Sequence, residues 1–309
     1  GGSGSPAEIQ PPFPFGSLVL AFAFLVPMNF VIQAYGGTML NERINRRGEL
    51  LLVAPVSPGD IVAGKTLPYL GLLVGLTTLV AVAVGGSAVA VAAAIPIALL
   101  FLAATFAGAM FARSFKELTF VTVTISVFLT AYTFVPAIFA NVTPIALISP
   151  LTVVVRDLQP LQSVSAPEFA FATAPFTLCA GVLFALGTGI YREEDLFTQR
   201  PVPLKLLDAL AVRVTRPRDA AILAGLSVPF VFVAELLAVA ILFALPVSVT
   251  VPLLLLAVAV VEEVAKSLHL FAAFEADRFP DTRRTALVLG GLAGLGFFVG
   301  EKFTAVVQV

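Results

Sequence analysis

The sequence predicts an all-α, polytopic membrane protein with about eight transmembrane helices. Of its 309 residues 59% are hydrophobic and 12% are charged. The mean hydropathy of +1.02 is far above that of a soluble domain. Eight apolar segments are each long enough to cross a bilayer, which takes about 20 helical residues. These observations leave no room for a sizeable soluble domain.

The eight predicted spans follow one another with short connections. Prolines lie in or at the ends of seven of them, and such prolines predict kinks rather than breaks, because neighbouring helices re-satisfy the freed backbone groups. The spans are 16–36, 67–85, 89–111, 118–140, 169–191, 220–245, 250–272 and 286–306, and the prolines are Pro27, Pro68, Pro96, Pro136, Pro175, Pro229 and Pro252.

The distribution of Lys and Arg predicts the orientation of the spans. Basic residues concentrate after the first, third, fifth and seventh spans, whereas the opposite loops contain only Arg156. Positively charged loops stay in the cytoplasm, so residue 1 is expected to be extracytoplasmic. Residues 1–15 then form an outer segment whose Gly1–Ser5 start is typical of a linker. An outward start also predicts a further span before residue 1.

The charge balance narrows the classes of partner. The net charge is −1 and there is no basic tract, which excludes nucleic acid as an expected partner. We expect a multi-pass protein of the cell membrane, surrounded by the lipid bilayer.

The loop 41–65 is the most informative stretch of the first half. It contains a charged helical turn, the apolar run 50–53, and a second short helix that begins at Ser57 or Asp60. The stretch is amphipathic and too short to cross, so we expect it at the membrane surface, open to a partner. A solvated connection between two spans explains the same pattern.

Two stretches resemble type-2 ABC exporter permeases, the NatB-like group in particular. The resemblance covers about residues 12–205, although the first span and the large outer domain of the family are not found before it. It rests on Glu42-Arg43, Arg47-Gly48-Glu49-Leu50-Leu51, Pro55-Val56-Ser57 and Ile61-Val62-Ala63-Gly64-Lys65 in the loop, and on 191–199, which is similar to the family's C-terminal tail.

This resemblance implies an ATPase partner, short helices in the outer loop and a dimer of permease domains. The loop 41–65 would include the coupling helix that docks on a separate cytoplasmic ATPase subunit. The outer loop 141–168 would form short re-entrant helices, and two copies of the permease domain would pack together. The residues implied in docking are Glu42, Arg43, Arg46, Arg47, Glu49 and Lys65.

The chain lacks the G-x-x-x-x-G-K-[ST] loop that cradles ATP phosphates. ATP is therefore expected on the partner subunit, and the permease itself would need no cofactor. The first five spans contain no charged side chain. An ion path through them would have to use hydroxyls or backbone carbonyls, and a lipid or other amphipathic substrate fits their apolar lining equally well.

All the charged or imidazole side chains inside apolar spans occur in the last third of the chain. Such charges are costly at mid-membrane, so they indicate a functional site by default. Glu262, Lys266 and His269 share one helical stripe, and Glu263 lies beside it. Either they form an ion pair that holds helices together, or the carboxylates and His269 form a metal-and-base site.

The last third also resembles PrsW-type intramembrane proteases, over about residues 219–309. The resemblance rests on Glu262-Glu263-x-x-Lys266 and Phe297-x-x-x-Glu301. It implies Glu262, Glu263 and Glu301 as catalytic or metal-binding carboxylates and zinc as cofactor. The metal-and-base interpretation then makes Glu263, Glu301 and His269 the candidate ligands, although His269 matches no known position of the family. Later histidines on which the family relies would follow Val309. Counting from the loop ends places Glu262 about 16–18 Å from the outer face and Glu301 about 7–9 Å from it.

Two domains and two functions are therefore predicted. Residues 16–205 form an ABC exporter permease-like domain, and residues 206–309 form an incomplete PrsW-like domain. The leading hypothesis is the permease subunit of an ABC exporter, and the alternative is an intramembrane metalloprotease. A membrane subunit that uses both parts only for docking is a third hypothesis.

Overall fold

The computed structural model describes residues 15–44, 56–112, 114–138, 145–159, 163–190, 202–242 and 245–307. All regular structure in these ranges is helical, and eight helices are long and apolar enough to cross a membrane. The predicted all-α, polytopic fold is therefore confirmed. The chain forms two compact units, Phe15–Val202 and Pro203–Val309. The predicted boundary lies between residues 205 and 206.

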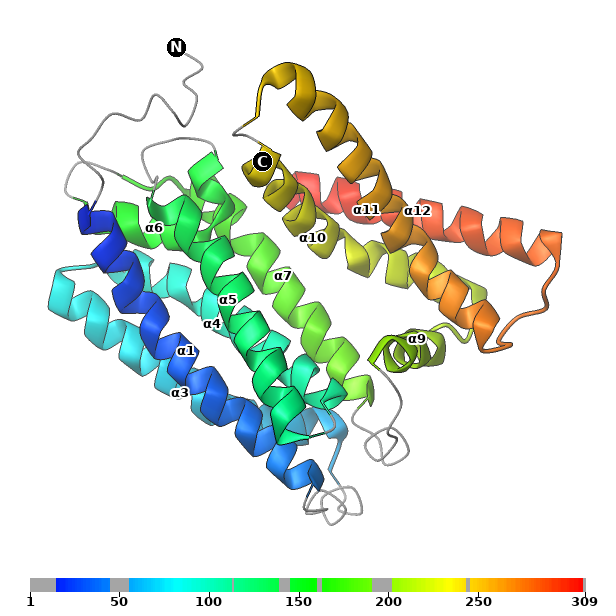
Figure 1. Cartoon of the computed structure of the whole chain (residues 1–309), viewed down its shortest axis with the longest axis horizontal. Coiled ribbons are helices and arrows are strands. Elements are labelled where there is room, and N and C mark those ends of the chain that lie inside the picture. The colour runs from blue at the N-terminus through cyan, green and yellow to red at the C-terminus, as the bar shows by residue number, and fades with distance from the viewer. Residues whose placement is uncertain are drawn as a thin grey trace. The chain divides into compact units, whose positions relative to one another are not determined.

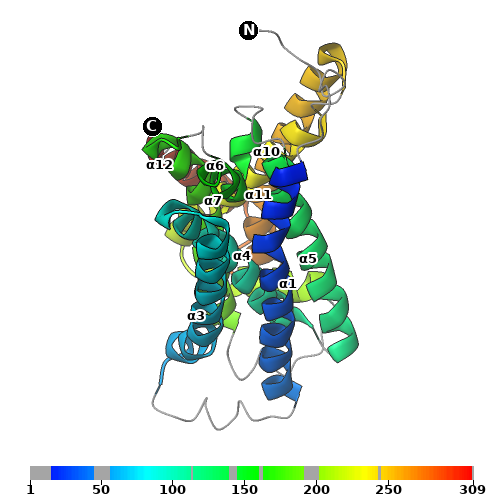
Figure 2. The same cartoon turned by 90° about the vertical axis from the view of Figure 1, so that its left-hand side faces the viewer.

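The described residues of the first unit form five long helices and two short ones (Figures 1 and 2). They are α1 (Phe15–Ile44), α3 (Pro58–Val84), α4 (Ala88–Phe111), α5 (Phe115–Ile138), the 3-10 helix η2 (Ile145–Ile148), α6 (Pro150–Asp157) and α7 (Ala166–Ile190).

Helix α4 forms the centre of the first unit. It contacts α1, α3, α5, α6 and α7. The alanines Ala93 and Ala94 are completely buried and let neighbouring helices approach closely, while the buried rings of Phe101 and Phe106 fill the space between them.

The prediction of a separate short surface helix in the loop 41–65 was wrong, because that helix is the start of α3. The hydroxyl of Ser57 accepts a hydrogen bond from the Asp60 amide at 3.1 Å, and the Asp60 carboxylate accepts one from the Ser57 amide at 3.1 Å. This capping box starts a helix that continues without interruption to Val84. Pro68 lies inside α3 and does not break the helix. The segment therefore forms the start of a membrane span.

Two short helices lie in the predicted outer loop 141–168, across one end of the bundle (Figure 2). Every residue of α6 from Pro150 to Arg156 is buried. Arg156 donates to Glu168 of α7 at 3.0 Å, and Asp157 accepts hydrogen bonds from the amide and hydroxyl of Ser87. These contacts fasten α6 to α7 and to the turn between α3 and α4.

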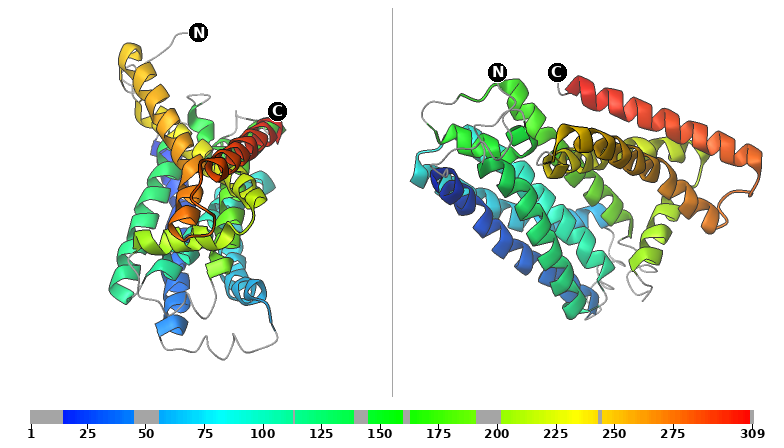
Figure 3. Two further views of the ribbon diagram at one scale, coloured as in Figure 1. Left: turned by 90° about the vertical axis from the view of Figure 1, so that its right-hand side faces the viewer. Right: turned by 45° about the horizontal axis from the view of Figure 1, so that its top comes forward.

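The second unit consists of α9 (Val202–Arg213), α10 (Pro217–Leu242), α11 (Val247–Glu275) and α12 (Arg283–Val307). Helices α10 and α12 run side by side, whereas α11 crosses them (Figures 1 and 3). Helix α9 was not predicted as an element, although its leucines and alanines recur at helical spacing.

Small residues bring α10 and α12 into backbone contact. A side chain at Gly296 would collide with the carbonyl oxygen of Ala221, and one at Gly300 would come within 2.9 Å of the carbonyl oxygen of Gly225. Ala221 and Gly225 are four residues apart, as are Gly296 and Gly300, so each pair presents one small-residue face. This spacing is typical of closely packed membrane helices.

Candidate functional site

Lys266 lies at the centre of a group of charged side chains in the second unit. Its Nζ atom is 2.6 Å from a carboxylate oxygen of Glu262 and 3.5 Å from one of Glu263. The same ammonium group lies 4.4 Å from the ring centroid of Phe297 on α12. Lys266 therefore offsets the charge of two carboxylates on α11 and joins that helix to α12.

The local sequence explains this geometry. Residues 262 and 266 are four apart and residues 263 and 266 three apart on one helix, so both carboxylates face the lysine from the preceding turn. The ion-pair interpretation of the stripe matches these contacts. Glu262 and Lys266 are each largely shielded, with exposed side-chain fractions of 33% and 24%.

Carboxylates from three helices gather in this region. Glu235 of α10 lies within electrostatic range of Glu262, Lys266 and Glu301. We call Glu235, Glu262, Glu263, Lys266 and Glu301 the charge cluster. The charge cluster thus contains all three predicted catalytic carboxylates, Glu262, Glu263 and Glu301, and Glu235 interacts electrostatically with two of them, Glu262 and Glu301.

The depth difference estimated from the loop ends stays a prediction. Helix α11 extends from Val247 to Glu275, beyond the predicted span, and it crosses α12 rather than running parallel to it.

His269 is engaged elsewhere. Its side chain is buried, and its Nε2 atom lies 3.0 Å from the carbonyl oxygen of Ala220 on α10. The ring also interacts with the carbonyl of Ala265, one turn earlier. The Nε2 atom therefore donates its proton to the carbonyl of Ala220 and has no lone pair to offer a metal.

The described geometry does not fit a zinc ion at Glu263, Glu301 and His269. Glu263 and Glu301 have exposed side-chain fractions of 74% and 57%, and His269 is committed to backbone carbonyls. Within the described part of the chain, no three His, Cys, Asp or Glu side chains gather closely enough to hold a metal. Zinc binding stays a prediction.

The predicted docking residues are only partly described. Glu42 and Arg43 belong to the last turn of α1, and Lys65 is half-buried two turns into α3. Arg46, Arg47 and Glu49 lie outside the described residues.

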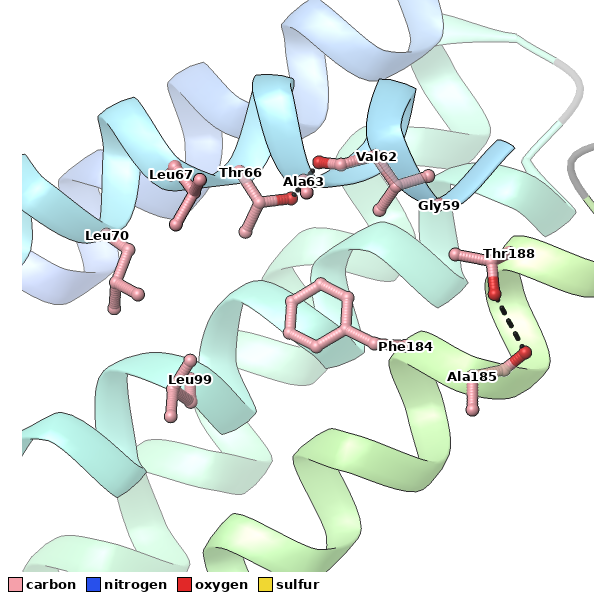
Figure 4. A pocket seen from close by; sticks show the side chains of 10 residues that line it. All are labelled: Gly59, Val62, Ala63, Thr66, Leu67, Leu70, Leu99, Phe184, Ala185 and Thr188. Carbon is pink, nitrogen blue, oxygen red and sulfur yellow. Dashed lines mark hydrogen bonds between the residues drawn. The ribbon is translucent and has the colours of Figure 1, made fainter. Parts of the chain in front are cut away.

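An apolar cavity opens between α3, α4 and α7 in the first unit (Figure 4). It has a volume of about 340 Å³, and none of its ten lining residues is acidic, basic or imidazole. Its two hydroxyls are satisfied within their own helices, since Thr66 donates to Val62 and Thr188 to Ala185. The cavity can hold an apolar group but supplies no acid or base. Sequence reasoning missed it because its lining comes from three separate spans.

A polar strip between α1 and α5 was also missed. Asn29 donates to Thr130 at 3.0 Å and accepts a hydrogen bond from Ser126. One turn later, Thr122 donates to Gln33 at 3.0 Å. Two amides four residues apart in an otherwise apolar span are the sequence signal that indicates this strip.

The fold defines a multi-pass membrane protein. No protein-family model, curated protein or solved structure gave a significant match to the sequence.

Proposed function

We propose that the chain is the transmembrane permease subunit of an ABC exporter in the cell membrane. Its first unit would carry the translocation path, a separate cytoplasmic subunit would hydrolyse ATP, and two copies of the permease would act together. The observation that supports this most directly is the position of the apolar cavity at the start of α3, immediately after the proposed docking loop.

Helix α3 offers a route from docking to the cavity. The loop 41–65 ends in the capped first turns of α3, and Gly59, Val62 and Ala63 in these turns line the cavity. A movement of this end of α3 by the docked ATPase would therefore shift the wall of the cavity. The capping box keeps this end of the helix rigid.

The lining favours an amphipathic substrate, such as a lipid, over a sodium ion. The cavity offers apolar side chains and two hydroxyls that are already bonded. The oxygen-rich strip on α1 and α5 could bind a cation, but Asn29 and Gln33 already bond Ser126, Thr130 and Thr122. An acyl chain needs no polar ligands, and its burial against apolar side chains is favourable.

An intramembrane metalloprotease of the PrsW type is the second candidate. It is favoured by the approach of Glu235, Glu262 and Glu301 from three helices. The charge cluster would contribute carboxylates, and Lys266 would offset part of their charge.

Purification of the full chain from its own membranes in detergent tests the two candidates together. Bound proteins are identified by mass spectrometry, and zinc is measured in the same sample. The permease proposal predicts a stoichiometric subunit with an ATP-binding loop and no zinc. Stoichiometric zinc without an ATPase would overturn it in favour of the protease.

A further inference from the structure

The cavity between α3, α4 and α7 extends along these helices from their ends toward their middle. Gly59 and Thr188 lie at one end of the cavity. Leu70 and Leu99 lie at the other end (Figure 4). Gly59 belongs to the first turn of α3 and Thr188 to the last turn of α7, whereas Leu99 is in the middle of α4. Because all three helices are membrane spans, the cavity reaches from near one membrane surface to about the centre of the bilayer.

The length of the cavity matches one leaflet. The rise along α3 from Gly59 to Leu70 is about 16 Å. The hydrocarbon core of a bilayer is about 30 Å thick, so each leaflet contributes about 15 Å. An acyl chain from the leaflet on the side of the loop 41–65 can therefore lie along the whole cavity, with its headgroup near the start of α3.

The cavity is open toward the outside of the first unit. Ala63 and Leu67, four residues apart on one face of α3, are exposed, and Leu67 has an exposed fraction of 60%. Ala185, on the α7 wall, is exposed as well. These residues belong to membrane-spanning segments, so the opening is reached from the lipid. An acyl chain can enter sideways without passing through water.

Both side walls of the cavity are fastened to neighbouring helices. On the α3 wall, the hydroxyl of Thr66 lies 2.8 Å from that of Tyr35 on α1. On the α7 wall, the ring of Phe184 stacks on Phe106 of α4 at 5.9 Å, and a side chain at Gly187 would collide with the same Phe106 ring. The cavity is therefore preformed, and a ligand that fills it does not first have to separate the helices.

The lining and the volume narrow the ligand to a single apolar chain. No lining residue is acidic, basic or imidazole, so the lining has no group that neutralises a charged headgroup. The volume of about 340 Å³ is at the lower end of ligand pockets, which measure about 300 to 1,000 Å³. This space suits one acyl chain and leaves the headgroup and a second chain outside.

We propose that the cavity holds one acyl chain of a membrane lipid, which enters sideways from the leaflet on the side of the loop 41–65. The free end of the chain lies near Leu70 and Leu99. Its ester end lies near Gly59 and Thr188. The inference rests on the proposed function in one respect, because the bound lipid would be the substrate that the exporter takes up.

Photo-crosslinking of the full chain in phosphatidylcholine vesicles tests the position of the lipid. Two phosphatidylcholine probes are compared, one with a diazirine at the end of an acyl chain and one with a diazirine next to the ester. Mass spectrometry of the peptides should find the first probe on Leu70 and Leu99. It should find the second on Gly59 and Thr188. The opposite order, or cavity residues labelled no more strongly than Phe120, an exposed residue of α5, would overturn the proposal.

Filling the cavity supplies a second measurement. Ala63→Phe places a ring in the cavity and should reduce the labelling of Leu99 at least about fivefold, because the ring occupies the space of the acyl chain. Ala83→Phe, the same change at an exposed position of α3 outside the cavity, is the matched control and should leave the labelling unchanged. Ala185→Phe repeats the test from the α7 wall if Ala63→Phe lowers the unfolding midpoint. Undiminished labelling in both cavity variants would contradict the proposal.

The labelling is measured without ATP, so its outcome is separate from that of the transport proposal. A chain that is labelled as expected but carries no ATPase would keep the lipid site and lose the transport role. A chain that co-purifies with an ATPase but shows no labelling in the cavity would keep the transport role and lose the lipid site.

Discussion

At the scale of single residues, the behaviour of the charge cluster depends on Lys266. This lysine contacts Glu262 and Glu263 directly and lies within range of Glu235. Its aliphatic stem and its position over Phe297 let an ammonium group remain in an apolar span. Without it, Glu262 and Glu263 would lose the cation that lies beside them on α11.

Replacing Lys266 should therefore destabilise the second unit. We expect Lys266→Met to cost about 2 kcal/mol, because an intramembrane carboxylate loses its counter-charge. Thermal unfolding in detergent can be followed by circular dichroism, since the chain has no tryptophan. Adding Glu262→Gln to Lys266→Met should recover part of the loss, and an unchanged midpoint in the single variant would show that the pair contributes nothing.

At the scale of elements, packing depends on where small residues meet. Gly296 faces the backbone of Ala221, whereas nothing lies within 4 Å of a side chain built at Gly290 on the same helix. The two glycines look alike in the sequence, and only the contact between α10 and α12 distinguishes them.

Gly296→Ala should push α10 and α12 apart. Overpacking of this kind costs about 1 to 3 kcal/mol, so the unfolding midpoint should fall. Gly290→Ala is the matched control, and it should leave the midpoint unchanged or raise it, because alanine favours a helix. Equal midpoints for the two variants would contradict the close approach seen here.

The start of α3 offers a second prediction for an element. Ser57→Ala removes the side-chain cap and should weaken the first turn by about 1 kcal/mol. Hydrogen exchange measured by mass spectrometry should speed up over residues 58–62 and not in the rest of α3. Thr78→Ala, which removes a hydroxyl bonded within the middle of α3, should leave residues 58–62 as protected as before.

The elements themselves could largely be predicted from the sequence. All eight spans occur, because each needs only a long apolar segment. The helix start at Ser57 was predicted, but its continuation into the following span was not, since Asp60 and Lys65 look like loop residues although they belong to the first turns of α3. Of the candidate site, the pair of Glu262 and Lys266 follows from helix periodicity. The electrostatic interaction of Glu235 with Glu262 and Glu301 does not follow from the sequence, because it depends on how three helices cross.

At the scale of the whole molecule, the two units present different chemistry. The first unit has spans whose charged residues lie near their ends, such as Asp60 and Lys65 in α3, together with a polar strip and an apolar cavity. The second unit concentrates its intramembrane charges on α10, α11 and α12. Under the permease proposal, this second unit stabilises the assembly, and its carboxylates are not needed for ATP-driven transport.

The rate of ATP hydrolysis by the purified complex in lipid vesicles tests the central proposal most directly. We expect the wild-type chain to support hydrolysis by its bound ATPase, and Arg46→Ala combined with Arg47→Ala to reduce the stimulated rate at least about tenfold, by loss of docking contacts. Glu263→Gln should leave this rate unchanged. If the paired arginine substitutions left hydrolysis intact, or if no hydrolysis accompanied the chain, the proposal that it is an ABC exporter permease would be contradicted.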